Sequence, residues 1–237
     1  MAKANEGFKV LDHGPIVRLD EGLWRVEGSL EGMPLKRVMT VAKRGDGLLV
    51  IHNAIALRDA EMKELESFGP VGFIVVPNGW HRLDAPAFKK RYASAKIVCP
   101  PGARKKVEEV VPVDLVYEDF PADEHVTLRA LAGVKAAEGV MTVKTPSGTT
   151  LVFNDAIFNM PHLSGMQGFL LKYVTQSSGG PRVSRLFRLF GIKDKAAYRA
   201  DLESLAATPG LVRIIVSHHE TIEADAANVL RSVAASV

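Results

Sequence analysis

Side chains that can bind metals or move protons follow several predicted β-strands. Largely apolar runs over residues 48–51, 72–76, 151–153 and 211–216, the last interrupted by Arg213, are typical of buried strands. Ligands of α/β proteins bind beyond the carboxyl ends of such strands, and imidazole and carboxylate groups are ligands of zinc and iron. The residues that follow the four runs are His52-Asn53, then Asn78 with His81 and Asp84, then Asn154-Asp155, and finally Ser217-His218-His219-Glu220. The pattern predicts one polar or metal-binding site built from four strand ends.

Each of these residues also has a simpler interpretation. A single histidine in a loop is more often a hydrogen-bonded packing residue than a metal ligand. An aspartate after a strand is more often a turn former or a helix cap. The hypothesis therefore depends on the whole set of strand ends meeting in space.

The surrounding elements predict a layered α/β protein. Residues 7–51 are β-rich, helices are predicted over 58–68 and 86–92, and a strand over 95–99. The second half predicts antiparallel strands at 113–117, 126–131, 140–144 and 149–153, then a strand over 211–216 and a helix over 220–233. Two such halves predict a four-layer α/β/β/α sandwich, a single domain over residues 1–237 with a helical insertion at about 160–205.

Composition narrows the class of protein. The chain has 237 residues, 47% hydrophobic and 24% charged, which is typical of a soluble globular protein. No apolar run approaches the roughly 20 residues of a membrane span, and the first seven residues have no apolar stretch typical of a secretory signal. A single cysteine fits a reducing compartment, so we expect a cytoplasmic protein. Because Cys99 has no neighbouring histidine or basic residue in sequence, we expect a buried structural thiol.

The order of elements resembles the metallo-β-lactamase fold, and more closely a divergent branch of that superfamily. The resemblance runs from about residue 22 to residue 220 and implies the same four-layer sandwich. It is carried by the segments Gly45–Asn53 (GDGLLVIHN), Leu65–Gly69 (LESFG), Ile74–His81 (IVVPNGWH), Tyr92–Val98 (YASAKIV), Ser147–Phe158 (SGTTLVFNDAIF) and Ile214–His218 (IIVSH).

The main metal motif of this family, H-x-H-x-D-H, is degenerate in this chain. In ungapped register its four positions hold Asn78, Trp80, Arg82 and Leu83, of which only the amide oxygen of Asn78 is a weak potential ligand. The next family histidine falls near residues 133–135, where the chain has none. The remaining positions match better, because Asp155 stands where the family places its bridging aspartate and His218 where it places its last histidine.

The resemblance implies a reduced site with one metal. His81 and His218, with Asp155 and either Asp84 or Glu138, would suit zinc or iron, while His52 or His219 could move a proton. The family's chemistry implies a hydrolase acting on a small, anionic substrate. The alternative is a chain without metal or any other cofactor, in which the same cleft is a polar pocket and the protein is a binding or interaction module.

A basic segment in the predicted insertion would serve that alternative. Residues 172–199 carry seven cations and one anion, so this window has a net charge of +6 while the whole chain has +3. Over residues 181–191, Arg182, Arg185 and Arg188 recur every three residues among Leu and Phe, as in a basic amphipathic helix. It could be a plain surface helix whose apolar face packs on the domain, a lid that supplies arginines to an anionic substrate, or a peripheral membrane or protein contact. Nucleic acid is not expected as a partner, because the rest of the chain is net negative.

Overall fold

Two β-sheets form the centre of the molecule, which is known from a computed structural model that describes residues 4–5 and 7–237. The larger sheet has seven strands in sequence order. The first four pair antiparallel, and the last four, β4 to β7, pair parallel. These strands are β1 (Val17–Asp20), β2 (Leu23–Leu30), β3 (Met33–Lys43), β4 (Leu49–His52), β5 (Val71–Val75), β6 (Lys96–Cys99) and β7 (Leu115–Val116).

The second sheet has the order β13-β10-β9-β8. Its strand β10 pairs antiparallel with β9 and parallel with β13, so the ends of β10 and β13 lie at the same edge. A short third pair joins β11 and β12. The strands are β8 (Val126–Ala130), β9 (Gly139–Thr145), β10 (Gly148–Phe153), β11 (Phe158–Met160), β12 (Gly180–Arg182) and β13 (Leu211–Val216).

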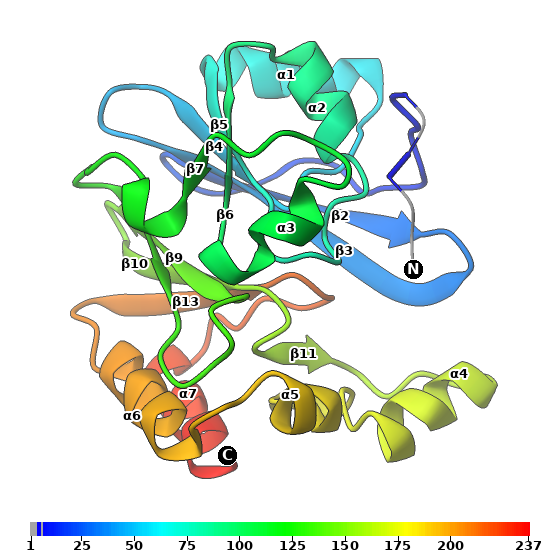
Figure 1. Ribbon diagram of the computed structural model, residues 1–237, viewed down its shortest axis with the longest axis vertical. Helices are drawn as coiled ribbons and strands as arrows, with labels where there is room; N and C mark the ends of the chain where they lie inside the picture. The colour runs from blue at the N-terminus through cyan, green and yellow to red at the C-terminus, as the bar shows by residue number, and fades with distance from the viewer. Residues whose placement is uncertain (1–3, 6) are drawn as a thin grey trace.

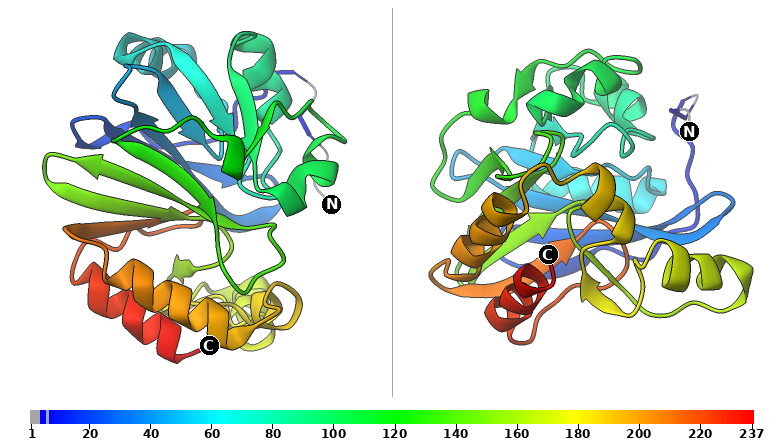
Figure 2. Two further views of the ribbon diagram at one scale, coloured as in Figure 1. Left: turned by 60° about the vertical axis from the view of Figure 1, so that its left-hand side comes forward. Right: turned by 60° about the horizontal axis from the view of Figure 1, so that its bottom comes forward.

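Helices cover the outer face of each sheet (Figures 1 and 2). The larger sheet carries α1 (Asp59–Phe68), α2 (Ala85–Arg91) and α3 (Arg104–Val107), and the smaller one α6 (Lys195–Ala206) and α7 (Ala226–Ala235). Between β11 and α6 the chain forms α4 (Gly165–Phe169), a π-helical turn η3 (Leu170–Val174) and α5 (Arg185–Phe190). Two 3₁₀ turns, η1 (Pro101–Ala103) and η2 (Tyr117–Asp119), complete the helical elements of the described residues.

The alternation of side chains along the strands explains the four layers. In β4, Val50 points to the core between the sheets, while Leu49 and Ile51 point to the core under α1 and α2. In β13, Ile215 points between the sheets and Ile214 toward α6 and α7. Both sheets are therefore covered on both faces, as their continuous apolar runs predict. The predicted four-layer α/β/β/α sandwich is confirmed.

Two predicted elements differ from the structure. The strand predicted at 113–117 is only Leu115–Val116, and it pairs parallel with β6 in the larger sheet instead of joining the antiparallel half. The last helix begins at Ala226 and not at 220, because Ile222 pairs back onto Ile214 as an antiparallel bridge and holds the preceding loop extended. No helix within residues 4–5 and 7–237 is long and apolar enough to cross a membrane.

Candidate metal centre

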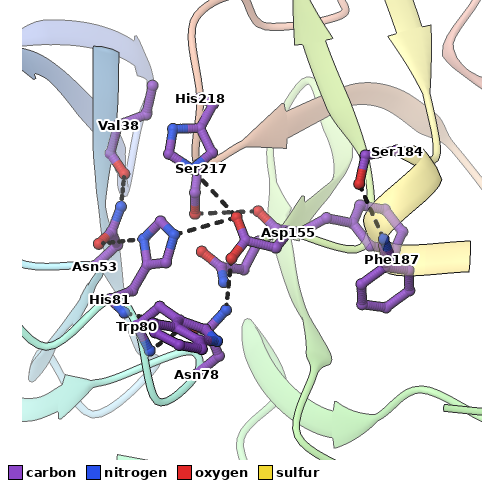
Figure 3. Close-up of polar contacts among 12 residues, drawn as sticks. Val38, Asn53, Asn78, Trp80, His81, Asp155, Ser184, Phe187, Ser217 and His218 are labelled. Carbon is purple, nitrogen blue, oxygen red and sulfur yellow. Dashed lines mark hydrogen bonds and ion pairs between the residues drawn. The ribbon is translucent and has the colours of Figure 1, made fainter. Parts of the chain in front are cut away.

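The four predicted strand ends meet at one edge of the sandwich. His52 pairs with Val75 at the ends of β4 and β5, and Phe153 pairs with Val216 at the ends of β10 and β13. The two sheets are joined here by the backbone hydrogen bond from Val38 N–H to the Ser217 carbonyl, 2.9 Å. The loops that follow these strands bring Asn53, His81, Asp155 and His218 into one cluster (Figure 3).

Asp155 lies between two imidazoles. Its Oδ1 atom is 3.2 Å from Nε2 of His81 and 3.2 Å from Nε2 of His218. One ligand atom from each of the three residues lies within 4.8 Å of the other two, so the three form a group that could hold a metal ion. The side chains of His81 and His218 are 8% and 6% exposed, whereas that of Asp155 is 22% exposed and gives the group access to the cavity described below.

The other nitrogen of each imidazole has an oxygen acceptor. Nδ1 of His218 donates to the carbonyl of Lys36 in β3 at 2.9 Å. Nδ1 of His81 donates to Oδ1 of Asn53 at 3.1 Å. The orientation of that amide is fixed, because Asn53 Nδ2 donates to the Val38 carbonyl at 2.9 Å. When each neutral ring carries its proton on Nδ1, these acceptors bind that proton and the Nε2 lone pair faces Asp155.

This arrangement favours a cation between the three side chains. Two lone pairs and a carboxylate oxygen repel one another unless a proton or a metal ion lies among them. Burial lowers the pKa of His81, although Asp155 partly opposes this effect. Burial raises the pKa of Asp155, but His81 and the hydrogen bonds with His218 outweigh it and hold this pKa well below its usual range. An ionised aspartate and two imidazoles with free Nε2 lone pairs are the ligand set that a divalent ion takes.

The second oxygen of Asp155 is held by Asn78. Asn78 Nδ2 donates to Asp155 Oδ2 at 2.7 Å and to Glu138 Oε1 at 2.6 Å, and its Oδ1 accepts the backbone N–H of Trp80 and of His81. Its amide oxygen is thus already occupied by two donors, and the expectation that it could serve as a weak metal ligand is wrong. Asn78 instead links the loop that carries His81 to the carboxylate of Asp155, which faces the His81 ring.

Glu138, predicted as a supporting ligand, lies beside the group and outside it. It accepts hydrogen bonds from Asn78 and from Asn154 Nδ2, the latter at 3.3 Å. Burial and the nearby charge of Asp155 raise the pKa of Glu138 well above its usual value. Its observed contacts are the hydrogen bonds from Asn78 and Asn154, and it is not one of the three grouped residues.

The other predicted residues are placed elsewhere. Asp84 forms a buried ion pair with Arg37, 2.9 Å, and accepts from Asn5. His52 is 2% exposed, and burial with the charge of His81 lowers its pKa to about 3. His219 accepts the Lys36 N–H at 3.3 Å, and burial with the charge of His218 lowers its pKa to about 4. None of these three side chains joins the metal-capable group, and His52 and His219 lie outside the cavity lining.

A cavity of about 760 Å³ opens beside the group. His81, Asp155, His218 and Glu138 lie in its wall, together with the cations Arg37, Arg82, Lys106 and Lys135. Much of the remaining wall is apolar, including Trp80 at 64% exposure, Phe158, and Leu186, Phe187 and Phe190 of α5. In the lid alternative Arg182, Arg185 and Arg188 would reach into the cleft, but none of them lies in this wall, to which α5 contributes Leu186, Phe187 and Phe190.

Several solved structures that superpose on this chain are metallo-β-lactamases. The sequence matches no family model and no curated protein at a significant level. A metallo-β-lactamase from Erythrobacter litoralis superposes with a TM-score of 0.59 at 15% identity, over 97% of this chain and 100% of that one. One from Pontibacter korlensis gives 0.61 at 9% identity, over 95% and 100%. The FIM-1 enzyme from Pseudomonas aeruginosa, in a mono-zinc form, gives 0.58 at 12% identity, over 94% and 96%. The chain therefore has the metallo-β-lactamase fold in a divergent form.

Several positioning residues could not be assigned from the sequence. Asn53 has a left-handed backbone with φ of 58°, which turns the chain directly after β4 and directs its amide toward His81. An asparagine after a buried strand is a signal for such a turn, but not for its partner. Phe158 stacks on His218 with ring centroids 5.3 Å apart. Lys36 contributes its backbone carbonyl, a contact that no side-chain pattern can reveal.

Proposed function

We propose that this chain is a metal-dependent hydrolase with a single metal ion, held by His81, Asp155 and His218. The observation that supports this most is the pair of imidazoles whose Nε2 atoms approach one carboxylate oxygen while their Nδ1 protons are bound elsewhere. Three protein ligands with an accessible side are typical of catalytic sites, whereas structural zinc sites are usually closed by four. Zinc or iron would suit these ligands, and when bound would lower the pKa of its water and polarise a scissile bond.

The protein's own residues fix the ligands. Asn53 and the Lys36 carbonyl hold both imidazoles in the tautomer that leaves Nε2 free. Asn78 holds Asp155 by its other oxygen, so the carboxylate cannot rotate away from the histidines. These contacts reduce the motion that must be lost when a metal and a substrate bind.

The substrate that fits the cavity has an apolar body and an anionic group. Aromatic and aliphatic side chains make up much of the wall, which favours an apolar body. A free cation in the same wall would bind the anionic group. Lys135 lies in this wall and has no ion-pair partner within residues 4–5 and 7–237, whereas the amine of Lys106 forms an ion pair with Glu109 at 2.9 Å. We expect the anionic group of the substrate to lie near Lys135.

Three single substitutions test the metal site. His81→Ala and His218→Ala are each expected to lose bound metal and hydrolysis of phosphate esters, thioesters or lactones while the protein stays folded. His219→Ala is the matched control, because it removes an adjacent imidazole that lies outside the group. Metal retained at the native ratio in both His81→Ala and His218→Ala would contradict the proposal, and so would equal loss in all three variants.

A further inference from the structure

A large part of the exposed apolar surface is concentrated in one segment. Of thirteen large hydrophobic side chains that are exposed among the described residues, eight lie between residues 166 and 190, each 45–74% exposed. They are Met166, Phe169, Leu170, Tyr173, Val174, Leu186, Leu189 and Phe190, on α4, η3 and α5. We call this set the apolar face. Exposed apolar side chains concentrated in this way point to an interaction site.

The segment stands at one end of the molecule. α4 and the turn after it lie away from both sheets, beside α5 (Figures 1 and 2). η3 and α5 contain no buried residue, and in α4 only Gly168 is buried. The interpretation of α5 as a plain surface helix whose apolar face packs on the domain fits Phe187 but not the exposed Leu186, Leu189 and Phe190. Its leucines and Phe190 are largely open to solvent, while Phe187 is the side chain that packs inward.

The segment that carries the apolar face has charge of one sign in its own sequence, although Asp225, just before α7, lines the same cavity as Arg182 and Arg188. Residues 156–193 contain no Asp or Glu but five cations, Lys172, Arg182, Arg185, Arg188 and Lys193. Cations directly precede exposed apolar side chains in the sequence at Lys172-Tyr173, Arg185-Leu186 and Arg188-Leu189. This combination fits a surface with negative charge over an apolar layer, since long basic side chains can reach the charge while their neighbours enter the layer.

A second copy of this chain does not fit the same face. A twofold contact through this segment would bring its cations toward the same cations of the second copy, with no Asp or Glu of residues 156–193 to offset them. An anionic lipid surface has the complementary charge and needs no matching shape, which suits apolar side chains spread over three short elements.

We propose that α4, η3 and α5 dock this protein on the surface of an anionic phospholipid bilayer. Leu186 and Phe190 belong both to the apolar face and to the wall of the cavity beside the candidate metal centre. Docking would therefore place the mouth of that cavity at the lipid surface. The proposal does not depend on the proposed function, because lipid binding requires neither metal nor turnover.

Vesicle sedimentation with the full chain tests this proposal. We expect partition onto vesicles of phosphatidylglycerol and phosphatidylcholine, little partition onto phosphatidylcholine alone, and a decrease with added salt. Since each surface cation contributes about 1 kcal/mol, or roughly fivefold, Lys172→Gln with Arg185→Gln should weaken partition about 25-fold. The charge-matched control is Lys63→Gln with Lys90→Gln, two exposed cations outside the segment, and should partition like the native chain.

A second pair of variants tests the apolar side chains. The double variant Phe169→Ser with Leu189→Ser should partition onto anionic vesicles at least tenfold less than the native chain. The control is Val10→Ser with Val17→Ser, which changes exposed apolar positions outside the segment and should partition like the native chain. Thermal unfolding should stay the same in all four variants. No partition of the native chain onto anionic vesicles, or equal losses in the test and control variants, would overturn the proposal. So would a dimer in solution that Phe169→Ser with Leu189→Ser dissociates, because the occupant would then be a second copy.

Discussion

Asn53 offers the sharpest test of how the candidate metal centre is held. Its Oδ1 accepts from His81 Nδ1 at 3.1 Å, and without this acceptor the ring is free to rotate or to place its proton on Nε2. Either change removes the lone pair that faces Asp155. Loss of such a neighbouring hydrogen bond costs metal sites roughly 10–100-fold in affinity, about 1.4–2.7 kcal/mol.

The left-handed backbone of Asn53 allows this effect to be separated from stability. With φ at 58°, Asn53→Ala combines loss of the side chain with a backbone strain of about 1 kcal/mol or more, whereas Asn53→Gly loses the same hydrogen bonds without that strain. We expect both variants to lose metal affinity equally, while Asn53→Ala is the less stable of the two by about 1 kcal/mol. Asn53→Asp keeps an oxygen acceptor for His81 and should keep affinity within a fewfold.

The assay is competition for Zn²⁺ against a chromophoric chelator, combined with guanidinium unfolding of each metal-free variant. The reasoning would be refuted by native affinity in Asn53→Gly, because the hydrogen bond to His81 would then not hold the ligand. It would also be refuted if affinity followed stability across the three variants, with Asn53→Gly near native and only Asn53→Ala weakened.

Three further predictions concern the neighbouring residues. Burial raises the pKa of Cys99 to about 12, so at pH 8 the native chain should hold about a thousandfold less thiolate than the unfolded chain. A thiol reagent should therefore modify Cys99 only after unfolding, and rapid modification of native protein would contradict this. Asn78→Asp replaces two donated hydrogen bonds with repulsion between carboxylates, and unfolding should show a loss of several kcal/mol at pH 7 that shrinks toward pH 4. A loss that is the same at both pH values would be inconsistent with repulsion. Arg37→Met leaves Asp84 buried without its partner and should cost about 3–5 kcal/mol of unfolding free energy, most of which Arg37→Met with Asp84→Leu should restore. Equal stability of the single and double variants would show that the buried charge is not the cause.

The sheets and their layers could be predicted because the apolar pattern carries that information directly. Runs such as Ile214–Val216 are apolar on both faces, which requires cover on both sides, and the strand that contains this run, β13, has the predicted bounds. The expectation that Leu115–Val116 belongs to the antiparallel half is wrong, because a two-residue strand has too few alternating positions to indicate its sheet or its direction.

The candidate ligands could be proposed from strand ends, but their selection required the fold. His218 and His219 are adjacent in sequence, and only the structure shows that the first meets Asp155 while the second, at φ of 63°, turns toward Lys36. Asp84 follows His81 by three residues and is instead bound by Arg37 from a different strand. Partners this distant along the chain leave no local pattern.

The basic segment shows the same limit for surfaces. The spacing of Leu186, Leu189 and Phe190 predicts a helix with an apolar side, but not whether that side packs on the body or points to solvent. That choice depends on where α5 stands relative to the sheets, and the observed exposure follows from its place beside the cavity and away from the core.

The central claim is that His81, Asp155 and His218 hold one metal ion, and elemental analysis of untagged protein purified without chelators tests it most directly. The account predicts about one equivalent of zinc, iron or manganese per chain in the native protein. It predicts less than about a tenth of that in His218→Ala under the same purification. A native chain that holds no metal, even after incubation with excess zinc and removal of the unbound ion, would contradict it.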